Sequence, residues 1–260
     1  MKYQRQIDLL QYINNKGTVS IAELLEHFHI SKATLNRDLT DLEKEESIRK
    51  VHGGVVSNLP MQTFELPINK KELYNKAYKE AIATQAVSLI QSNQSIILDS
   101  GSTIWYLAKE LVKRRDIENL TVITCDLKVA YTLAEAENDN LSLFVLGGMK
   151  HKESFDLYGP TIVEILKSLN VDLYFMGVAA FDNKTGITHT YLDDVSTKKA
   201  MLQCAKKVVL CADSSKYGLV KRWRICNVED VDMIITDNHL SDESLAEIKE
   251  KCSEIKLVNE

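Results

Sequence analysis

The chain has 260 residues, of which 45% are hydrophobic and 27% charged, with ten glycines and three prolines. This composition is typical of a folded globular protein and excludes a fibrous or largely disordered chain. The formal net charge of -5 at pH 7 argues against a protein that coats nucleic acid through a general positive potential. Residues 1–57 contain eight basic and eight acidic side chains, so the acidic excess belongs to the rest of the chain.

No stretch approaches the roughly 18 apolar residues of a membrane helix, and the N-terminus lacks the apolar core of a signal peptide. We therefore expect a cytoplasmic protein without a membrane segment. The five cysteines form no C-x-x-C pair and lie mostly in apolar runs, which favours buried, reduced thiols. They are Cys125, Cys204, Cys211, Cys226 and Cys252. We expect no metal and no cofactor.

The start of the chain carries apolar side chains at helical spacing, interrupted by short turns. The pattern predicts a helix over residues 4–13 that ends in the turn 14–17. Ser20, followed three residues later by Glu23, is suited to cap a second helix. Ser31 can cap a third helix that runs to about residue 45. Two helices joined by so short a turn form a helix-turn-helix.

The next segment, residues 47–56, changes from helical to alternating periodicity. Its Gly53-Gly54 pair suits a tight hairpin turn, so the segment is predicted to be a wing. The fold alone is equally compatible with a protein-protein module, but basic and polar side chains on the expected reading face favour double-stranded DNA. Asn36 and Arg37 are best suited to read bases, because asparagine can pair with adenine and arginine with guanine bidentately. The candidates for DNA contact are Ser31, Lys32, Thr34, Asn36, Arg37, Arg49, Lys50, His52, Gly53 and Gly54.

Two of the prolines, Pro60 and Pro67, lie in a segment without periodicity. The predicted division is a DNA-binding domain over residues 1–57, a linker over 58–74 and an α/β domain over 75–260. In the last part short apolar strands alternate with helices, which implies a largely parallel sheet. Strands are expected near residues 95–99, 120–124, 141–146, 171–177, 207–212 and 231–236, and Pro160 marks the start of a helix.

The run Ser31-Lys-Ala-Thr-Leu-Asn-Arg-Asp-Leu, followed by Arg49-Lys-Val-His-Gly-Gly, resembles the signature of the DeoR family of bacterial regulators. The resemblance continues in Asp99-Ser-Gly-Ser-Thr, Val122-Ile-Thr-Cys-Asp, Leu146-Gly-Gly, Tyr158-Gly-Pro, residues 172–177, Lys198-Lys-Ala-Met and Ala212-Asp-Ser-Ser-Lys-Tyr-Gly. It implies an α/β sensor domain related in fold to sugar-phosphate isomerases and CoA transferases. It also implies a repressor of a sugar-use operon that responds to a phosphorylated sugar or related metabolite. We expect a homodimer or homotetramer on spaced half-sites of operator DNA.

The loop from Asp99 to Thr103 leaves a predicted strand and opens a helix, where amides and hydroxyls favour an anion. From the residues alone, a simple capped turn is as good an interpretation. Ligands of open α/β sheets bind at the carboxyl ends of the strands, so the ends of the next two strands are expected to line the same pocket. Lys198 and Lys216 are candidate cations through their match to the family's motifs. The candidate effector-binding residues are Asp99, Gly101, Ser102, Thr103, Thr124, Cys125, Asp126, Gly147, Gly148, Lys150, Lys152, Lys198 and Lys216.

Three features depart from the family's pattern. Asn36-Arg37 stands where the family commonly has two arginines, which points to a different operator. Cys125 stands where relatives often have asparagine, and Lys150 and Lys152 lie where they usually carry arginine. A regulator whose sensor has lost its ligand is therefore one alternative.

An isomerase with an accessory DNA-binding module is the other alternative. Isomerisation needs a carboxylate base, for which Asp99, Asp126, Asp182 and Asp213 are nominal candidates. However, the chain has Gly177-Val-Ala-Ala-Phe-Asp where pentose-phosphate isomerases have the acidic run Asp-Gly-Ala-Asp-Glu. We therefore do not expect an enzyme.

Overall fold

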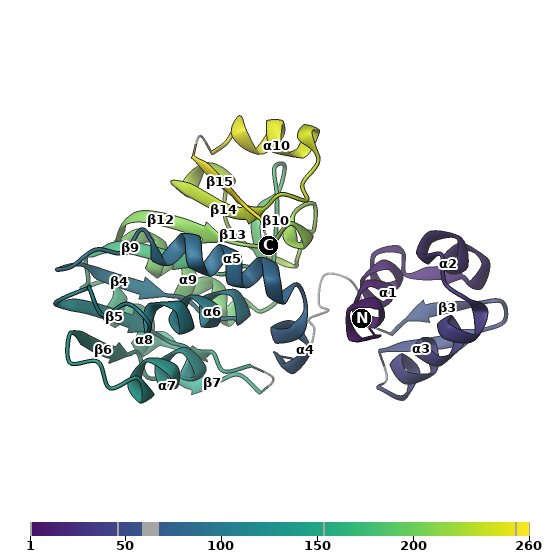
Figure 1. The fold of residues 1–260 in the computed structure, drawn as a ribbon, viewed down its shortest axis with the longest axis horizontal. Coiled ribbons are helices and arrows are strands. Elements are labelled where there is room, and N and C mark those ends of the chain that lie inside the picture. The colour runs from purple at the N-terminus through teal and green to yellow at the C-terminus, as the bar shows by residue number, and fades with distance from the viewer. Residues whose placement is uncertain (1, 46, 59–67, 153, 253, 260) are drawn as a thin grey trace. The chain divides into compact units, whose positions relative to one another are not determined.

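The computed structural model of the chain describes residues 2–45, 47–58, 68–152, 154–252 and 254–259. The chain forms two compact units, Met1–Tyr74 and Asn75–Glu260. Their secondary structure is labelled in Figure 1. Among the described residues, no helix combines the length and the apolar composition needed to cross a membrane.

The first unit is a winged helix-turn-helix. Its helices α1 (Lys2–Lys16), α2 (Ile21–Phe28) and α3 (Lys32–Lys44) share one apolar core with a small sheet. The sheet has the order β1-β3-β2, with strands β1 (Thr18–Ser20), β2 (Ile48–Val51) and β3 (Gly54–Ser57). The three predicted helices and the wing are confirmed, but α1 continues to Lys16, so most of the predicted turn 14–17 is helical. Strand β1 was not predicted, because three residues are too few to show an alternating pattern.

The predicted helix caps are confirmed, whereas the predicted wing turn is wrong by one residue. The hydroxyls of Ser20 and Ser31 each accept a hydrogen bond from the amide three residues later, at 3.1 and 3.2 Å. In the wing, Val51 pairs with Gly54, so the turn consists of residues 52–53 and Gly54 already belongs to β3. A Cβ atom on Gly54 would lie 2.6 Å from the Val19 carbonyl oxygen, so glycine is required there for the approach of β1.

The first unit continues beyond the boundary that the prolines suggested. Helix α4 (Ile68–Leu73) lies in the second half of the predicted linker, and Tyr74 is buried in the core of the first unit. The Tyr74 hydroxyl lies within hydrogen-bond distance of two acceptors on α1, Asp8 Oδ1 at 3.2 Å and Gln11 Oε1 at 2.9 Å. The compact unit therefore ends at Tyr74 rather than at residue 57, because a buried tyrosine anchors its last helix. Residues 59–67 lie outside the described residues.

The second unit is built on a seven-stranded sheet in the order β15-β14-β12-β9-β4-β5-β6, and all its neighbouring strands are parallel. The strands are β4 (Ser95–Leu98), β5 (Leu120–Thr124), β6 (Leu141–Val145), β9 (Val171–Met176), β12 (Ala205–Cys211), β14 (Met233–Asp237) and β15 (Ile255–Val258). The six predicted strands are confirmed. Their order reverses between β4 and β9, and such a switch point leaves a crevice at the carboxyl ends of the two strands.

Helices cover both faces of this sheet (Figure 1). Helices α5 (Lys76–Val87), α6 (Ser102–Leu111) and α7 (Leu127–Glu135) share a core with one face, which includes Ile96 and Leu98. Helices α8 (Pro160–Leu166), α9 (Leu192–Cys204) and α10 (Asp242–Lys249) share a core with the other face, which includes Ile97. Pro160 is the first residue of α8, as predicted. Burial on both faces explains why the strands are continuous apolar runs.

Shorter strands lie beyond the carboxyl edge of the sheet. Strands β7 (Met149–Lys150) and β8 (Leu157–Tyr158) form a hairpin, and β10 (Ala180–Asp182), β11 (Gly186–His189) and β13 (Trp223–Cys226) form an antiparallel sheet. None of them was predicted, because their partners lie apart in the sequence and two to four residues carry no periodicity. The short helices η1 (Ser214–Lys216) and η2 (Val228–Asp230) complete the unit.

Candidate functional site

Helix α3 presents a polar side opposite its buried stripe. Lys32, Asn36 and Arg37 are exposed, whereas Leu35 and Leu39 are fully buried. Ser31 caps the helix start, and its hydroxyl lies 2.9 Å from the hydroxyl of Thr34. The side chains predicted to read bases therefore lie on the solvent side of the helix, free of the core.

An ion pair that the sequence analysis missed fixes α3 to α1. Asp38 is 1% exposed and accepts hydrogen bonds from Arg5 Nε at 2.6 Å and Arg5 Nη2 at 3.3 Å. Gln6 donates to Asp38 at 3.3 Å and to Asp41 at 3.0 Å. A two-pronged guanidinium contact sets orientation as well as distance, so it positions the polar side of α3. No local pattern reveals it, because the partners lie on different helices.

The basic residues of the wing divide into two groups. Lys50 is bound to α3, since its Nζ donates to Thr40 Oγ1 at 2.6 Å and its amide to Glu43 Oε1 at 2.9 Å. Arg49 and His52 are exposed. Gly53 is exposed in the turn, but Gly54 is buried against β1. Lys50 and Gly54 thus shape the wing, while Arg49 and His52 remain presented on its surface.

In the second unit, Asp99 occupies the switch point between β4 and β9. It is 1% exposed. Its Oδ1 accepts from the Ser100 amide at 2.8 Å. Its Oδ2 accepts from the Tyr174 hydroxyl at 2.7 Å, the Gly177 amide at 3.0 Å and Lys198 Nζ at 2.6 Å. Asp99 therefore joins the ends of both strands to α9.

Lys198 is the cation of this network and is 3% exposed. Burial alone would lower its pKa, but the Asp99 carboxylate outweighs burial and raises the pKa above its ordinary value. Lys198 Nζ also donates to the Gly177 carbonyl at 3.1 Å. Lys198 therefore binds both Asp99 and Gly177, and these contacts hold the start of the loop between β4 and α6.

The same loop is tied to the next strand. The Gly101 amide donates to Asp126 Oδ2 at 3.2 Å, and Asp126 Oδ1 caps α7 by accepting from two amides at 2.7 and 3.0 Å. Thr124 Oγ1 accepts from the Asp126 amide at 3.1 Å. Burial raises the pKa of Asp126. Five predicted effector residues, Asp99, Gly101, Thr124, Asp126 and Lys198, therefore belong to one polar network.

The start of α6 lies beside this network. Among the described residues, no side chain caps the helix, whose N-cap is Gly101, and Ser102 and Thr103 are its first residues. The first amides of a helix lack partners within the helix and carry its positive dipole end. The described loop thus offers backbone amides and two hydroxyls to an anion.

The other predicted effector residues lie outside this network. Cys125 is buried in the core, where burial raises the pKa of its thiol well above the ordinary value. Lys150 and Lys152 are exposed on the β7–β8 hairpin, and Lys150 Nζ donates to the His151 carbonyl at 2.6 Å. Gly147 and Gly148 precede that hairpin, and a Cβ on Gly148 would lie 2.5 Å from the Tyr158 carbonyl oxygen. Lys216 lies in η1, close enough to the Asp213 carboxylate to lower its pKa.

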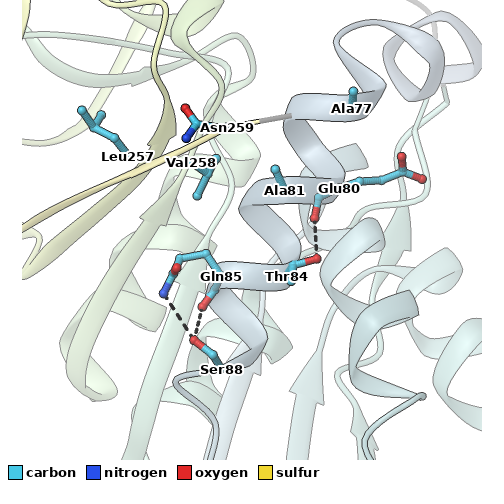
Figure 2. Close-up of a pocket in the computed structure, with 9 residues that line it drawn as sticks. All are labelled: Ala77, Glu80, Ala81, Thr84, Gln85, Ser88, Leu257, Val258 and Asn259. Carbon is cyan, nitrogen blue, oxygen red and sulfur yellow. Dashed lines mark hydrogen bonds between the residues drawn. The ribbon is translucent and has the colours of Figure 1, made fainter.

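Two surface cavities of the second unit have linings that do not favour an anion. A groove of about 750 Å³ lies between α5 and β15 (Figure 2), lined by five residues of α5, by Ser88 at its end and by Leu257–Asn259. It has no cationic side chain. A cavity of about 390 Å³ between the β7–β8 hairpin, α8 and α9 includes Glu164 and Asp193, whose carboxylates repel a phosphate.

A second polar cluster, which the sequence analysis missed, lies at the start of α9. Asp194 is 5% exposed; its Oδ1 lies 2.9 Å from His151 Nε2 and its Oδ2 lies 3.4 Å from His189 Nδ1. These residues come from β7–β8, β11 and α9, so no spacing in the sequence connects them. Within the described ranges, no three His, Cys, Asp or Glu side chains are arranged to hold a metal ion.

Comparisons with known proteins agree with these two units. Residues 5–60 match the DeoR-like helix-turn-helix domain, and residues 74–238 match the DeoR C-terminal sensor domain. The chain is 33% identical over 248 residues to YulB of Bacillus subtilis, an uncharacterised HTH-type transcriptional regulator, covering 95% of this chain and 93% of YulB. It is 32% identical to the HTH-type transcriptional regulator GolR of Listeria innocua, covering 92% of each chain.

Two further comparisons have lower sequence identity. A putative aga operon transcriptional repressor of Escherichia coli O157:H7 is 29% identical over 99% of this chain and 94% of that protein. Ribose 5-phosphate isomerase A of Methanocaldococcus jannaschii overlaps 55% of each chain with a TM-score of 0.41 and 20% identity, a partial overlap from which nothing about activity follows. On the match of both family domains and of full-length relatives, the chain belongs to the DeoR family of DNA-binding transcriptional regulators.

Proposed function

We propose that this regulator represses a sugar-use operon and that a phosphorylated sugar, bound at the switch point of the sensor sheet, changes its affinity for the operator. The observation that carries the proposal is the N-terminus of α6, which has no side-chain cap among the described residues and which Asp99 and Lys198 hold at the carboxyl edge of the sheet. Helix N-termini at such switch points suit phosphate groups. The name of the aga operon relative supports the repressor role.

On the DNA side, helix α3 is proposed to enter the major groove of operator DNA. Lys32, Asn36 and Arg37 are exposed along it, and Arg49 and His52 of the wing are suited to phosphates or the minor groove. A homodimer or homotetramer would place two such helices on spaced half-sites. A protein that acts on chromosomal operators works in the cytoplasm.

The effector and the operator are linked through the populations of two arrangements of the protein. If the sugar phosphate binds the DNA-competent arrangement less well, it lowers operator affinity, and operator DNA lowers effector affinity by the same factor. Gly177 and Ser100 are in close contact beside the loop. A ligand that displaces the loop at α6 would therefore also displace the end of β9 and, through Lys198, α9.

The test is a titration in both directions. Fluorescence anisotropy of labelled DNA from the promoter of the regulated operon is measured with the full-length protein, with and without each member of a panel of sugar phosphates. We expect one class of sugar phosphate to weaken operator binding, and operator DNA to weaken binding of that same compound equally. A regulator whose sensor has lost its ligand would bind DNA and respond to none of the panel.

No observation favours the isomerase alternative. The carboxylates weighed as catalytic bases already accept hydrogen bonds in structural positions: Asp99 in the switch-point network, Asp126 at the start of α7, and Asp182 from the Lys184 and Thr185 amides, both at 2.9 Å. Asp213 accepts from Ser215 and Asn75. We therefore infer a sensor without turnover, which an assay of aldose-ketose interconversion by the purified protein tests.

A further inference from the structure

Three buried polar atoms at the start of α9 have no hydrogen-bond partner among the described residues. They are Asp194 Oδ2, Thr190 Oγ1 and Thr197 Oγ1, in residues that are 5%, 4% and 3% exposed. His189 Nδ1 lies 3.4 Å from Asp194 Oδ2 but accepts a hydrogen bond from the Tyr191 amide at 3.3 Å. A ring nitrogen that accepts a hydrogen bond carries no hydrogen and therefore cannot donate one to Asp194.

Such atoms are uncommon in folded proteins, because a buried polar atom without a partner loses its hydration and gains nothing in return. Three of them within eight residues of one chain segment indicate that a group from outside the chain completes the site. A hydroxyl is the matching chemistry, since it donates to the Asp194 carboxylate and accepts from a threonine hydroxyl.

The cluster is continuous with the anion site at α6. Asp194 precedes Lys198 by one turn of α9, about 6 Å along the helix axis, and the Asp194 carboxylate acts electrostatically on Lys198. Lys198 in turn lies 2.6 Å from Asp99, at the start of the loop that leads into α6. His151 Nε2, 2.9 Å from Asp194 Oδ1, fixes the other oxygen of the carboxylate.

We propose that Asp194, Thr190 and Thr197 form the part of the effector site that binds hydroxyl groups, so that the effector is a phosphorylated sugar or polyol with hydroxyls on adjacent carbons. This inference rests on the proposed function, because it takes the phosphate to lie at α6. It excludes phosphorylated ligands without hydroxyls as effectors. The neighbouring cavity with Asp193 lies on the exposed side of α9 and is not part of the site.

The test compares three variants of the full-length protein: Asp194→Asn, Thr197→Val and, as a matched control, Asp193→Asn. Calorimetry and thermal shift measure binding of inorganic phosphate and of a panel of aldose, ketose and alditol phosphates with three to six carbons. For the wild type we expect at least one panel member to bind more tightly than inorganic phosphate. Asp194→Asn should weaken binding of that compound about tenfold or more, because charged hydrogen bonds are lost, and should not weaken binding of inorganic phosphate. Asp193→Asn should change neither.

Thr197→Val separates a ligand contact from a structural role. Because the hydroxyl has no partner among the described residues, its replacement by a methyl group of similar shape should leave the melting temperature of the free protein unchanged or raise it. The same variant should weaken the sugar phosphate about three- to tenfold. A lower melting temperature with unchanged ligand binding would mean that an internal water completes the hydroxyl, and would overturn the inference.

The remaining outcomes are distinct. If sugar phosphates bind the wild type but Asp194→Asn retains the full gain over inorganic phosphate, the inference about hydroxyl groups fails and the proposed function stands. If Asp193→Asn, rather than Asp194→Asn, removes the gain, the site lies in the neighbouring cavity and the inference also fails. If no panel member binds the wild type, both this inference and the proposed sugar-phosphate sensing fail.

Discussion

Lys198 Nζ lies 2.6 Å from Asp99 Oδ2, and both side chains are at least 96% buried. This ion pair joins α9 to the end of β4 at the switch point of the sheet. Removing one partner of a buried pair leaves the other charge without compensation, which is more costly than losing a pair at the surface. The stability of the second unit is therefore expected to depend strongly on this contact.

Replacing Lys198 with methionine keeps the length of the side chain and removes its charge. We expect Lys198→Met to lower the free energy of unfolding by about 3–5 kcal/mol, measured by urea denaturation at pH 7. Lys199→Met is the control, because Lys199 is exposed and should change stability by less than about 0.5 kcal/mol. Equal effects of the two variants would contradict this role for the pair.

Gly177 allows the end of β9 to approach the loop that opens α6. A Cβ on this residue would lie 2.5 Å from the Ser100 carbonyl oxygen and 3.2 Å from Ile104 Cγ1. We expect Gly177→Ala to lower the free energy of unfolding by about 1–3 kcal/mol through overpacking. The variant should also displace the loop and so reduce the thermal shift caused by phosphorylated ligands. Gly147→Ala, where a Cβ meets no described atom within 4 Å, should retain the stability of the wild type in the same thermal-shift assay.

Arg37 and Lys32 are expected to contribute to DNA binding in different ways. If Arg37 reads a base, Arg37→Ala should cost about 1–3 kcal/mol on the operator and little on unrelated DNA. If Lys32 contacts phosphate, Lys32→Ala should weaken binding to both DNAs alike and reduce the salt slope by about 1. Anisotropy titrations at several salt concentrations distinguish the two effects. Lys44→Ala, at the exposed other end of α3, provides the control.

Asp213 predicts a dependence of stability on pH. Burial alone would raise its pKa, but the Lys216 and Lys79 cations and its hydrogen bonds hold the pKa below the ordinary 3.8. A carboxyl with a lowered folded-state pKa contributes stability above its unfolded pKa and loses it as the pH falls through the folded pKa. Stability should therefore decline below about pH 4 partly through this group.

Lys79→Met tests that origin, because Lys79 is 2% exposed. Without this cation the folded pKa of Asp213 rises, so the variant should be destabilised at pH 7 and the difference from the wild type should shrink between pH 7 and pH 3. Denaturation curves at each pH measure the difference. A difference that stays constant over this range would show that Asp213 is not the titrating partner. Lys76→Met, on the exposed side of α5, should match the wild type throughout.

The cysteines are expected to be unreactive in the folded protein. All five are free, and four are buried, with Cys226 half-buried. Burial raises the pKa of Cys226 to about 12, so its thiolate is scarce at pH 8, and only thiolates attack disulfide reagents. Labelling with a disulfide reagent should be slow in buffer and should reach all five thiols only after denaturation. Rapid labelling of the native protein would contradict the buried environment.

Much of the fold was predictable because it depends on local signals. The serines that cap α2 and α3, the apolar runs of the central strands and Pro160 at the start of α8 each act within a few residues. The position of the loop between β4 and α6 was predictable for the same reason. The turn of the wing was misplaced by one residue because register depends on the cross-strand pair Val51 and Gly54, and Gly54 is explained only by the nearby β1.

The sequence by itself determined the winged helix-turn-helix, the parallel α/β sheet, the family and the position of the loop that opens α6, since periodicity, capping and motifs are properties of contiguous residues. Tertiary structure alone decided that Asp99 and Lys198 neutralise each other in the interior. It also decided that Tyr74 belongs to the first unit and that His151, His189 and Asp194 meet at the start of α9. These relationships depend on strand order and on the packing of segments far apart in the chain, for which residue spacing contains no signal.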